Sequence, residues 1–241
     1  MSRILKAYET RFRWLLEQVH ARRLTEGVEY LVQKARRVSA SEEKPLAAGL
    51  TEVYERLALQ PRFRPASAQS PPGLFFCDAG LGGLARWLRG AGYEALWEAG
   101  IDDDDLLLRA RRLGATVLTT DSMLMERRIL RDRLIPSFWL PPTLSIADQL
   151  ELTFREFGLR RRAPRCMKCG GELQAGEKQA LQARIPPKTY RWLNEYFVCG
   201  RCGKLFWHGT HWLRITKTLQ RVAESNSAPA SERQPAGVEK H

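Results

Sequence analysis

The sequence predicts an α/β fold, in which a parallel sheet with helices on both faces is preceded by a helical extension and followed by a small zinc ribbon. Two observations support this prediction. Short apolar runs alternate with amphipathic segments from residue 74 to residue 158, as in strands that are joined by helical crossovers. Two Cys-x-x-Cys pairs then follow between residues 166 and 202, in the arrangement of a zinc site.

The first 60 residues are predicted to form a helical N-terminal extension. Three helices are expected, over residues 4–19, 28–38 and 46–59. In the first of them, Tyr8 and Phe12 belong to an apolar stripe at helical spacing. Residues 61–73 have the composition of a linker, so we expect a domain boundary there. The extension carries no catalytic motif, and we expect a small appendage that could contact a protein partner.

The predicted sheet lies in residues 74–158. Strands are expected over residues 74–77, 93–97, 115–120 and 135–140. Helices are expected over residues 81–89, 106–113, 123–130 and 146–157. The zinc ribbon is assigned to residues 159–220. Residues 221–241 are rich in Ser, Ala, Pro and Glu, and this composition predicts a disordered tail.

The two cysteine pairs predict a structural zinc site. Each pair lies on a tight turn that directs two thiolates at one ion, and two such turns complete a tetrahedral set. Gly170, Gly200 and Gly203 accompany the pairs, as expected for turns that need positive φ. Disulfides are the alternative, but the chain lacks a secretory signal, and this favours metal. The expected ligands are Cys166, Cys169, Cys199 and Cys202.

Acidic residues follow three of the predicted strands. Asp78 ends the first strand, residues 102–105 are all aspartate after the second, and Asp121 ends the third. Ligands of open parallel sheets bind beyond the carboxyl ends of the strands, so we expect these carboxylates to converge. Oxygen ligands of this kind suit Mg²⁺ or Mn²⁺, which can activate water at a phosphodiester. The alternative for residues 102–105 is helix capping, and Asp121 could simply terminate its strand.

Charge and aromatic content favour a nucleic-acid partner. The net charge is +12, and residues 149–220 hold 14 basic and 5 acidic side chains against 9 and 11 in residues 71–148. A basic region with interleaved aromatic residues is typical of nucleic-acid binding. The alternatives are charge for solubility and aromatic residues that fill a small ribbon core. The candidate contacts are Arg86, Arg89, Arg161, Arg165, Lys168, Arg201, Lys204, Trp207, His208 and His211.

Two pairs of these candidates have further interpretations. His208 and His211 follow the last cysteine pair, so either could replace a cysteine as a zinc ligand. Arg86 and Arg89 follow Asp78 on one predicted helix, where they could hold a phosphate or only solvate that helix. No segment approaches the roughly 20 apolar residues of a membrane span. We therefore expect no membrane association and a cytoplasmic location.

Several motifs together resemble the Mut-seven C-terminal RNase family. They are Asp78 with the segment Leu-Gly-Gly-Leu-Ala-Arg-Trp-Leu-Arg at residues 81–89, the acidic helix start, and Leu-Thr-Thr-Asp at residues 118–121. The two cysteine pairs and Phe-Trp-His-Gly-Thr-His at residues 206–211 complete the resemblance. It covers about residues 74–215. Thr120 is a departure, since a basic residue is expected at that position.

The resemblance implies a PIN-like nuclease domain with a C-terminal zinc ribbon. The family acids map onto Asp78, onto Asp103 or Asp104, and onto Asp121. The implied activity is an Mg²⁺- or Mn²⁺-dependent cleavage of RNA that leaves 5′-phosphate and 3′-hydroxyl ends, with structural zinc and a ribbon that positions RNA. The alternative is a non-catalytic zinc-ribbon adaptor that binds ribosomal or transfer RNA.

Overall fold

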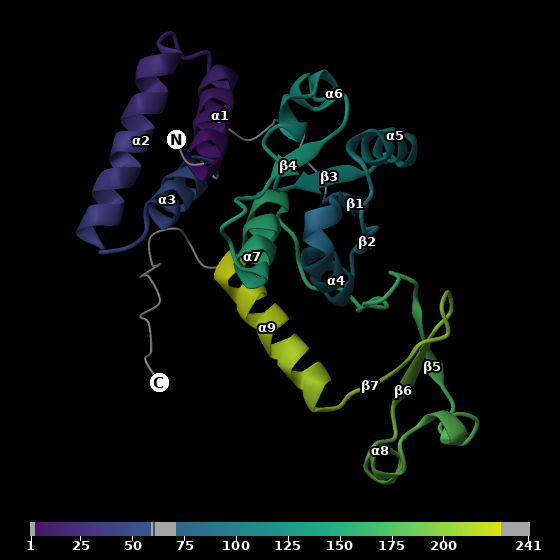
Figure 1. The fold of residues 1–241 in the computed structure, drawn as a ribbon. Coiled ribbons are helices and arrows are strands. Elements are labelled where there is room, and N and C mark those ends of the chain that lie inside the picture. The colour runs from purple at the N-terminus through teal and green to yellow at the C-terminus, as the bar shows by residue number, and fades with distance from the viewer. Residues whose placement is uncertain (1–2, 59, 61–70, 228–241) are drawn as a thin grey trace.

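A computed structural model describes residues 3–58, 60 and 71–227 (Figure 1). The helices are α1 Arg3–Gln18, α2 Leu24–Ser41, α3 Leu46–Ala58, α4 Gly82–Gly90, α5 Asp103–Leu113, α6 Arg128–Arg131, α7 Ile146–Phe157, α8 Pro187–Trp192 and α9 Thr210–Ser227. The strands are β1 Leu74–Cys77, β2 Glu94–Leu96, β3 Thr116–Thr119, β4 Ser137–Trp139, β5 Leu173–Gly176, β6 Tyr196–Cys199 and β7 Leu205–Trp207. Three short 3₁₀ helices are η2 Ala79–Leu81, η3 Leu124–Glu126 and η4 Gln182–Arg184. Most of the predicted linker lies outside the described residues.

The larger sheet is parallel, with the strand order β2-β1-β3-β4. Phe75 in the central strand β1 pairs with Ala95 on one side and with Thr116 on the other. Phe75 and Phe76 are both fully buried, as expected for a central strand with helices on both faces. The predicted α/β class is confirmed, although the helix expected over residues 123–130 is divided into η3 and α6.

Successive side chains of the sheet enter two different cores, which makes the fold a three-layer one. Phe76, Val117 and Trp139 belong to one core, together with residues of α1, α2, α3 and α5. Phe75 and Leu118 belong to the other core, together with residues of α4, α7 and α9. Because strand side chains alternate between faces, each face needs its own cover of helices.

The N-terminal helices are an integral layer of this fold, so the predicted appendage is wrong. The ring of Trp139 on β4 meets Tyr8 of α1 edge to face at 5.3 Å, and Tyr54 of α3 at 4.9 Å. Tyr8, Tyr54 and Phe12 have at most 1% of their surface exposed. The linker composition of residues 61–73 indicates a connection between two parts of the chain. It does not make the preceding helices a separate unit, because their apolar faces still require burial against the sheet.

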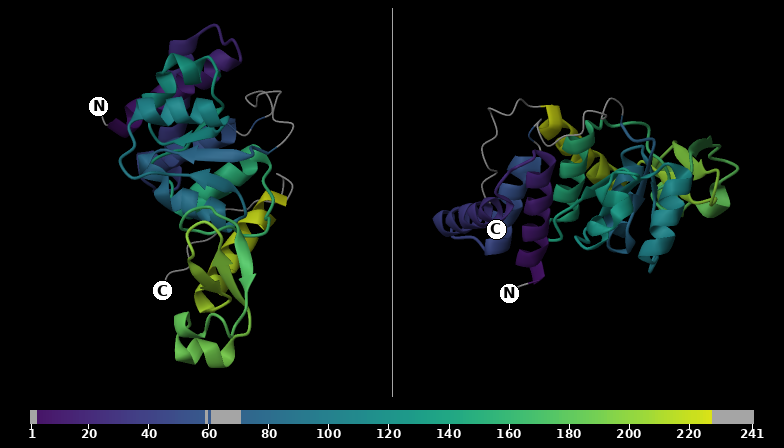
Figure 2. Two further views of the ribbon diagram at one scale, coloured as in Figure 1. Left: turned by 90° about the vertical axis from the view of Figure 1, so that its right-hand side faces the viewer. Right: turned by 90° about the horizontal axis from the view of Figure 1, so that it is seen from above.

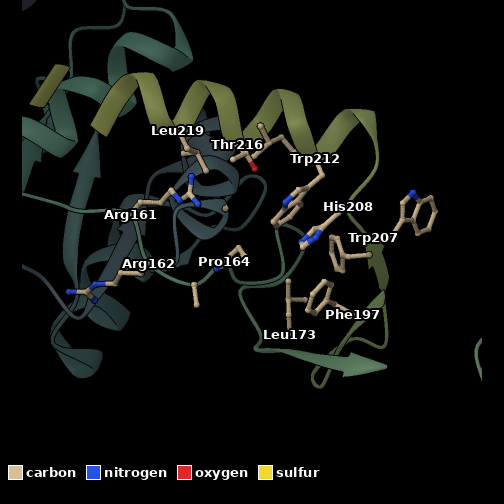
Figure 3. A pocket seen from close by; sticks show the side chains of 14 residues that line it. Arg161, Arg162, Pro164, Leu173, Phe197, Trp207, His208, Trp212, Thr216 and Leu219 are labelled. Carbon is tan, nitrogen blue, oxygen red and sulfur yellow. The ribbon is translucent and has the colours of Figure 1, made fainter. Parts of the chain in front are cut away.

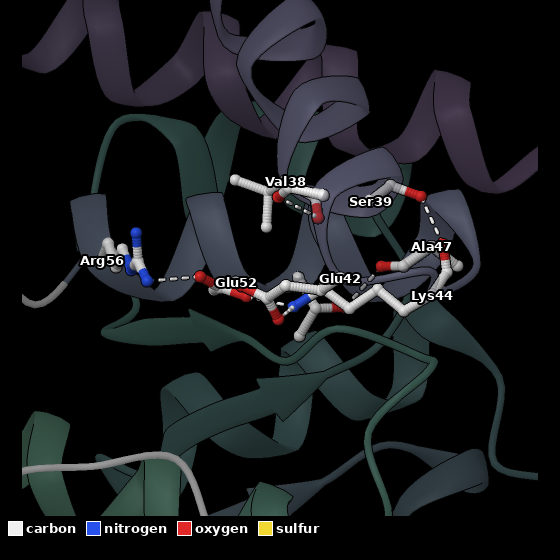
Figure 4. A network of polar contacts seen from close by, with 9 residues as sticks. Val38, Ser39, Glu42, Lys44, Ala47, Glu52 and Arg56 are labelled. Carbon is white, nitrogen blue, oxygen red and sulfur yellow. Dashed lines mark hydrogen bonds and ion pairs between the residues drawn. The ribbon is translucent and has the colours of Figure 1, made fainter.

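A network of ion pairs holds the turn between α2 and α3 (Figure 4). The ammonium group of Lys44 contacts Glu42 at 2.6 Å and also Glu52. Glu52 in turn pairs with Arg56 one turn further along α3. These contacts fix the angle between two helices of the outer layer.

The zinc ribbon projects away from the N-terminal helices, and α9 returns from it to the sheet (Figures 1 and 2). Strands β5, β6 and β7 form its antiparallel sheet, in that order. Ile215, Leu219 and Val222 of α9 are buried in the core that contains α7. The predicted ribbon and tail boundary at residue 220 is therefore wrong, because α9 belongs to the larger core and extends to Ser227. Residues 228–241 of the expected tail lie outside the described residues.

We predict that Phe12→Ala lowers the free energy of unfolding by about 3–5 kcal/mol, because it opens a cavity in the shared core. Tyr30→Ala is the matched control, since Tyr30 lies on α2 with 60% of its surface exposed. Urea denaturation of both variants measures the difference. An equal, small loss in both would contradict an integral N-terminal layer.

Candidate active site and zinc ribbon

Asp78 and Asp121 follow the neighbouring strands β1 and β3 at the carboxyl edge of the sheet. Asp78 is 9% exposed and caps η2. Its Oδ1 accepts a hydrogen bond from the Gly80 amide at 3.0 Å. Its Oδ2 accepts from the Thr119 hydroxyl and from the Thr120 amide, the latter at 3.0 Å. A carboxylate offers about four acceptor positions, so Asp78 keeps one, on Oδ1, for a further ligand.

The surroundings of Asp78 disfavour its charge when no cation is present. Burial raises the pKa of this carboxyl, and the charge of Asp121 raises it further. The hydrogen bonds from Thr119, Thr120 and Gly80 oppose these effects without cancelling them, so the pKa stays above its usual range. A cation placed between Asp78 and Asp121 would turn their repulsion into attraction.

Thr119 links the two aspartates and was not identified from the sequence. Its hydroxyl oxygen donates to Asp78 and accepts from the amide of Asp121 at 2.9 Å. Asp121 itself is exposed, and its Oδ1 accepts from the Met123 amide at 2.7 Å. The sequence did contain a signal for this role, which was a polar residue in a buried strand, two positions before an acid.

The aspartate run begins α5, where much of it serves local structure. Asp102 caps the helix by accepting from the Asp105 amide at 2.9 Å, so the capping alternative is confirmed for that residue. Asp104 is 82% exposed and pairs with Arg127 at 2.8 Å. Within the described residues, the one group of three or more potential ligands close enough to share an ion is the four cysteines. Asp103 and Asp104 therefore do not join Asp78 and Asp121 in a compact ligand group.

The four cysteines form a compact set that fits a tetrahedral zinc ion. The sulfur atoms all lie within 4.8 Å of one another, with Cys166 and Cys202 at 3.7 Å and Cys169 and Cys199 at 3.5 Å. Four thiolates are the donors of a closed structural zinc site, which leaves no position for substrate. Gly203, with φ of +67°, closes the second turn by donating to the Cys199 carbonyl at 2.9 Å.

Backbone donors prepare one of these thiols for metal. Burial alone would raise the pKa of Cys199, but the amides of Cys202 and Arg201, together with the thiols of Cys169 and Cys202, outweigh it and lower this pKa to about 6. Burial raises the pKa of Cys169 to about 12. Zinc ligation requires deprotonated thiols, so metal binding must release protons from this cluster.

Arg89 joins the sheet to the zinc ribbon, and its predicted contact with RNA is wrong. The side chain is 6% exposed and donates to the carbonyls of Ala95 at 2.7 Å, Lys168 at 2.8 Å and Met167 at 3.4 Å. Phosphate cannot reach a guanidinium that is buried among carbonyls. The sequence did not distinguish Arg89 from Arg86, because both lie on one amphipathic helix, although Arg86 is exposed.

Two more predicted RNA contacts turn toward the protein. Arg165 donates to the Gly170 carbonyl at 2.7 Å, and Arg201 donates to the Cys169 carbonyl at 2.9 Å. Both then approach Glu94 of β2, with nitrogen–oxygen distances of 4.0 Å and 3.4 Å. Glu94, which the sequence analysis did not single out, thus attaches both zinc turns to the edge of the sheet.

The remaining residues that were predicted to contact RNA lie around the space between the ribbon, α4 and α9. Arg86, Arg161, Lys168 and Lys204 are exposed and form no ion pair with any described residue. Trp207 is half-buried, and the ring of His208 contacts Glu195 at 3.1 Å. His211 lies in α9, but its side chain is outside the described residues.

A comparison with known protein families identifies the family of this chain. Residues 74–219, more than half of the chain, match the Mut7-C RNAse domain. The chain belongs to this family. The resemblance noted from the sequence is thereby confirmed, and membership of the Mut7-C RNAse domain family indicates a nuclease-like function on RNA. No curated protein and no solved structure shows a significant match.

The matched span excludes α1, α2 and α3, which form the outer layer of the sheet. In the described part of the chain, none of the helices is long and apolar enough to cross a membrane.

We predict about one Zn²⁺ per chain of freshly purified, reduced protein. Cys199→Ser should lose the metal and unfold the ribbon, because structural zinc contributes folding free energy directly. Cys77→Ala is the control, since this buried cysteine lies in β1, away from the cluster. Metal analysis of the three proteins tests the prediction, and a zinc-free wild type would contradict it.

We predict that Arg89→Met lowers the free energy of unfolding by at least about 2 kcal/mol, because buried carbonyls lose their donors. Arg86→Met, three residues earlier on α4, should change it by less than about 0.5 kcal/mol. Chemical denaturation gives both values. Equal stability of the two variants would show that Arg89 does not hold the ribbon.

Proposed function

We propose that this member of the Mut7-C RNAse domain family is a metal-dependent ribonuclease whose cation is held by Asp78 and Asp121. The carrying observation is the adjacency of these two acids, linked through Thr119, at the carboxyl edge of a parallel sheet. Carboxylate oxygens in this position suit Mg²⁺ or Mn²⁺. When bound, such an ion supplies a water of lowered pKa and charge stabilisation at a phosphodiester.

The protein's own residues then have separable tasks. Asp78 offers its free acceptor position on Oδ1, and the amides of Gly80 and Thr120 keep its carboxylate from rotating. Exposed Asp121 offers its second oxygen, Oδ2, because Oδ1 accepts from the Met123 amide. Water attack on phosphorus at such a site leaves 5′-phosphate and 3′-hydroxyl ends.

Asp103 and Asp104, at the start of α5, lie outside a compact group with Asp78 and Asp121, so in this proposal they join the acidic centre when a bound cation draws them closer. Asp104 contacts Arg127 through an exposed ion pair, and pairs of this kind are worth only about 0–1 kcal/mol. The pair can therefore open at small cost when a cation and a phosphate compete for its two partners. Zinc in the ribbon is structural in this proposal, and the ribbon positions RNA.

We predict that Asp78→Asn and Asp121→Asn each abolish cleavage of single-stranded RNA, since a carboxamide keeps the shape but removes the charge that holds the cation. Chelation of Mg²⁺ should have the same effect, and its return should restore activity. Asp132→Asn is the matched control, because Asp132 precedes β4 at the opposite edge of the sheet. Cleavage is measured by gel electrophoresis with labelled RNA.

The outcome distinguishes two functions. Loss of cleavage in the two site variants, with normal RNA binding and an active control, supports the ribonuclease. RNA binding without any cleavage by the wild type, at any Mg²⁺ or Mn²⁺ concentration, would contradict it. That result would favour a non-catalytic RNA-binding adaptor.

A further inference from the structure

Two cavities lie between the zinc ribbon and α9. The first, of about 560 Å³, is bounded by residues 161–164, by β6 and by α9 (Figure 3). The second, of about 570 Å³, is bounded by α4, the first zinc turn, β7 and α9. They adjoin, because both are lined by Phe206, Trp207, Trp212 and Ile215. Each volume is in the range of sites that hold a small organic molecule such as a nucleotide.

Aromatic rings form one wall of the first cavity (Figure 3). Trp212 of α9 stacks on His208 with ring centroids 5.2 Å apart and planes 29° apart. On its other side, the His208 ring meets Phe197 at 5.1 Å. Glu195 contacts Nδ1 of His208 at 3.1 Å and so fixes its position in the row. Because the His208 ring lies against two other rings and is held by Glu195, it stabilises the position of the Trp212 ring.

The charge around the cavities has one sign. Arg86 and the two lysines, Lys168 and Lys204, line the second cavity, and Arg161 lines the first. No aspartate or glutamate is among the described residues that line either cavity. Lys204 lies over the Phe206 ring at 5.7 Å, but none of these cations pairs with an acid among the described residues. Such cations beside a stacked indole match the two parts of a nucleotide, its phosphate and its base.

We propose that these adjoining cavities bind single-stranded RNA, with an unpaired base on Trp212 and the flanking phosphates on Arg86, Lys168 and Lys204. The inference rests on the proposed function and assigns it a substrate class, which is RNA that is unpaired where it contacts the ribbon. A base that remains paired keeps its faces stacked within the duplex and cannot cover the indole. A peptide is the other candidate occupant, and the uniformly positive lining favours RNA over it.

Helix α4 connects this site to the acidic edge. Its first turn follows η2, which Asp78 caps, and its last residue, Gly90, lines the first cavity. Nine residues of α-helix span about 14 Å. Arg86 lies between these ends. An RNA strand held by the ribbon would therefore meet Arg86 between the cavities and the helix end beside Asp78.

The test measures RNA binding by the full-length, zinc-loaded protein that carries Asp78→Asn, so that no RNA is cut. Fluorescence anisotropy compares a short labelled RNA with the same RNA annealed to its complement. We expect the single strand to bind more tightly. Trp212→Ala should weaken its binding by about 5- to 100-fold, as loss of one stacked base requires. Trp192→Ala, at an 84% exposed tryptophan of α8, should leave binding unchanged.

Two further comparisons separate stacking and charge from folding. Trp212→Phe keeps an aromatic face and should retain most of the affinity, while zinc content and thermal midpoint report on the fold of each variant. The double variant Lys168→Glu and Lys204→Glu should weaken binding of both RNAs and flatten the dependence on salt. The double variant Lys188→Glu and Arg191→Glu, on α8 and outside both cavities, is its control for net charge, because it changes the charge by the same four units.

Equal affinity for single and double strands, or equal behaviour of Trp212→Ala and Trp192→Ala, would overturn the proposal. Unchanged binding in both the Trp212→Ala protein and the double lysine variant would point to a protein segment as the occupant. These outcomes are independent of catalysis. A wild type that never cleaves RNA removes the proposed function, whereas the binding comparisons judge the cavity alone.

Discussion

The buried guanidinium of Arg89 determines how the zinc ribbon is placed on the sheet. It donates to the Ala95 carbonyl of β2 and to two carbonyls of the first zinc turn, and its side chain is 6% exposed. Arg89 lies near the end of α4, and Asp78 lies just before the start of that helix. The distance from the acidic edge to the ribbon is therefore set by one short, rigid element. The carbonyls of Met167 and Lys168 lie between Cys166 and Cys169, so this geometry depends on the turn that carries the first cysteine pair.

The N-terminal layer also reaches the candidate active site. Tyr8 and Tyr54 pack against Trp139, and the indole of Trp139 donates to the Thr120 carbonyl at 3.0 Å. The amide of Thr120 is one of the donors that fix Asp78. The packing of α1 and α3 is thus connected to the carboxylate through two residues, Trp139 and Thr120. The family match begins only at residue 74, so helices outside the matched span, together with α5 inside it, cover this face of the sheet.

Local spacing made some features predictable, and tertiary environment decided the rest. Cysteine pairs and short apolar strands are patterns of a few residues, so the zinc ligands and the parallel sheet were evident from the sequence. Arg86 and Arg89 stand three residues apart on one helix, yet one is exposed and the other is buried. The difference arises because the first zinc turn, some 80 residues later in the chain, contacts Arg89, and the helical pattern alone does not show this contact. The surroundings of the acids also could not be predicted from local sequence, because Asp104 pairs with Arg127, which lies 23 residues later in the chain.

Each zinc turn carries one arginine and one lysine, and the two residue types point to different tasks. Arg165 and Arg201 use their several fixed donors to bind a carbonyl of the zinc turns and to approach Glu94. Lys168 and Lys204 remain exposed at the second cavity. A planar guanidinium suits fixed contacts to several acceptors, whereas a mobile, strongly hydrated ammonium suits a phosphate that comes and goes. Roughly half of the basic side chains predicted to contact RNA are thereby engaged within the protein, while Lys168 and Lys204 stay exposed at the cavity that Trp212 also lines. Cations beside a stacking platform favour a single strand over a duplex, because a duplex keeps its bases covered.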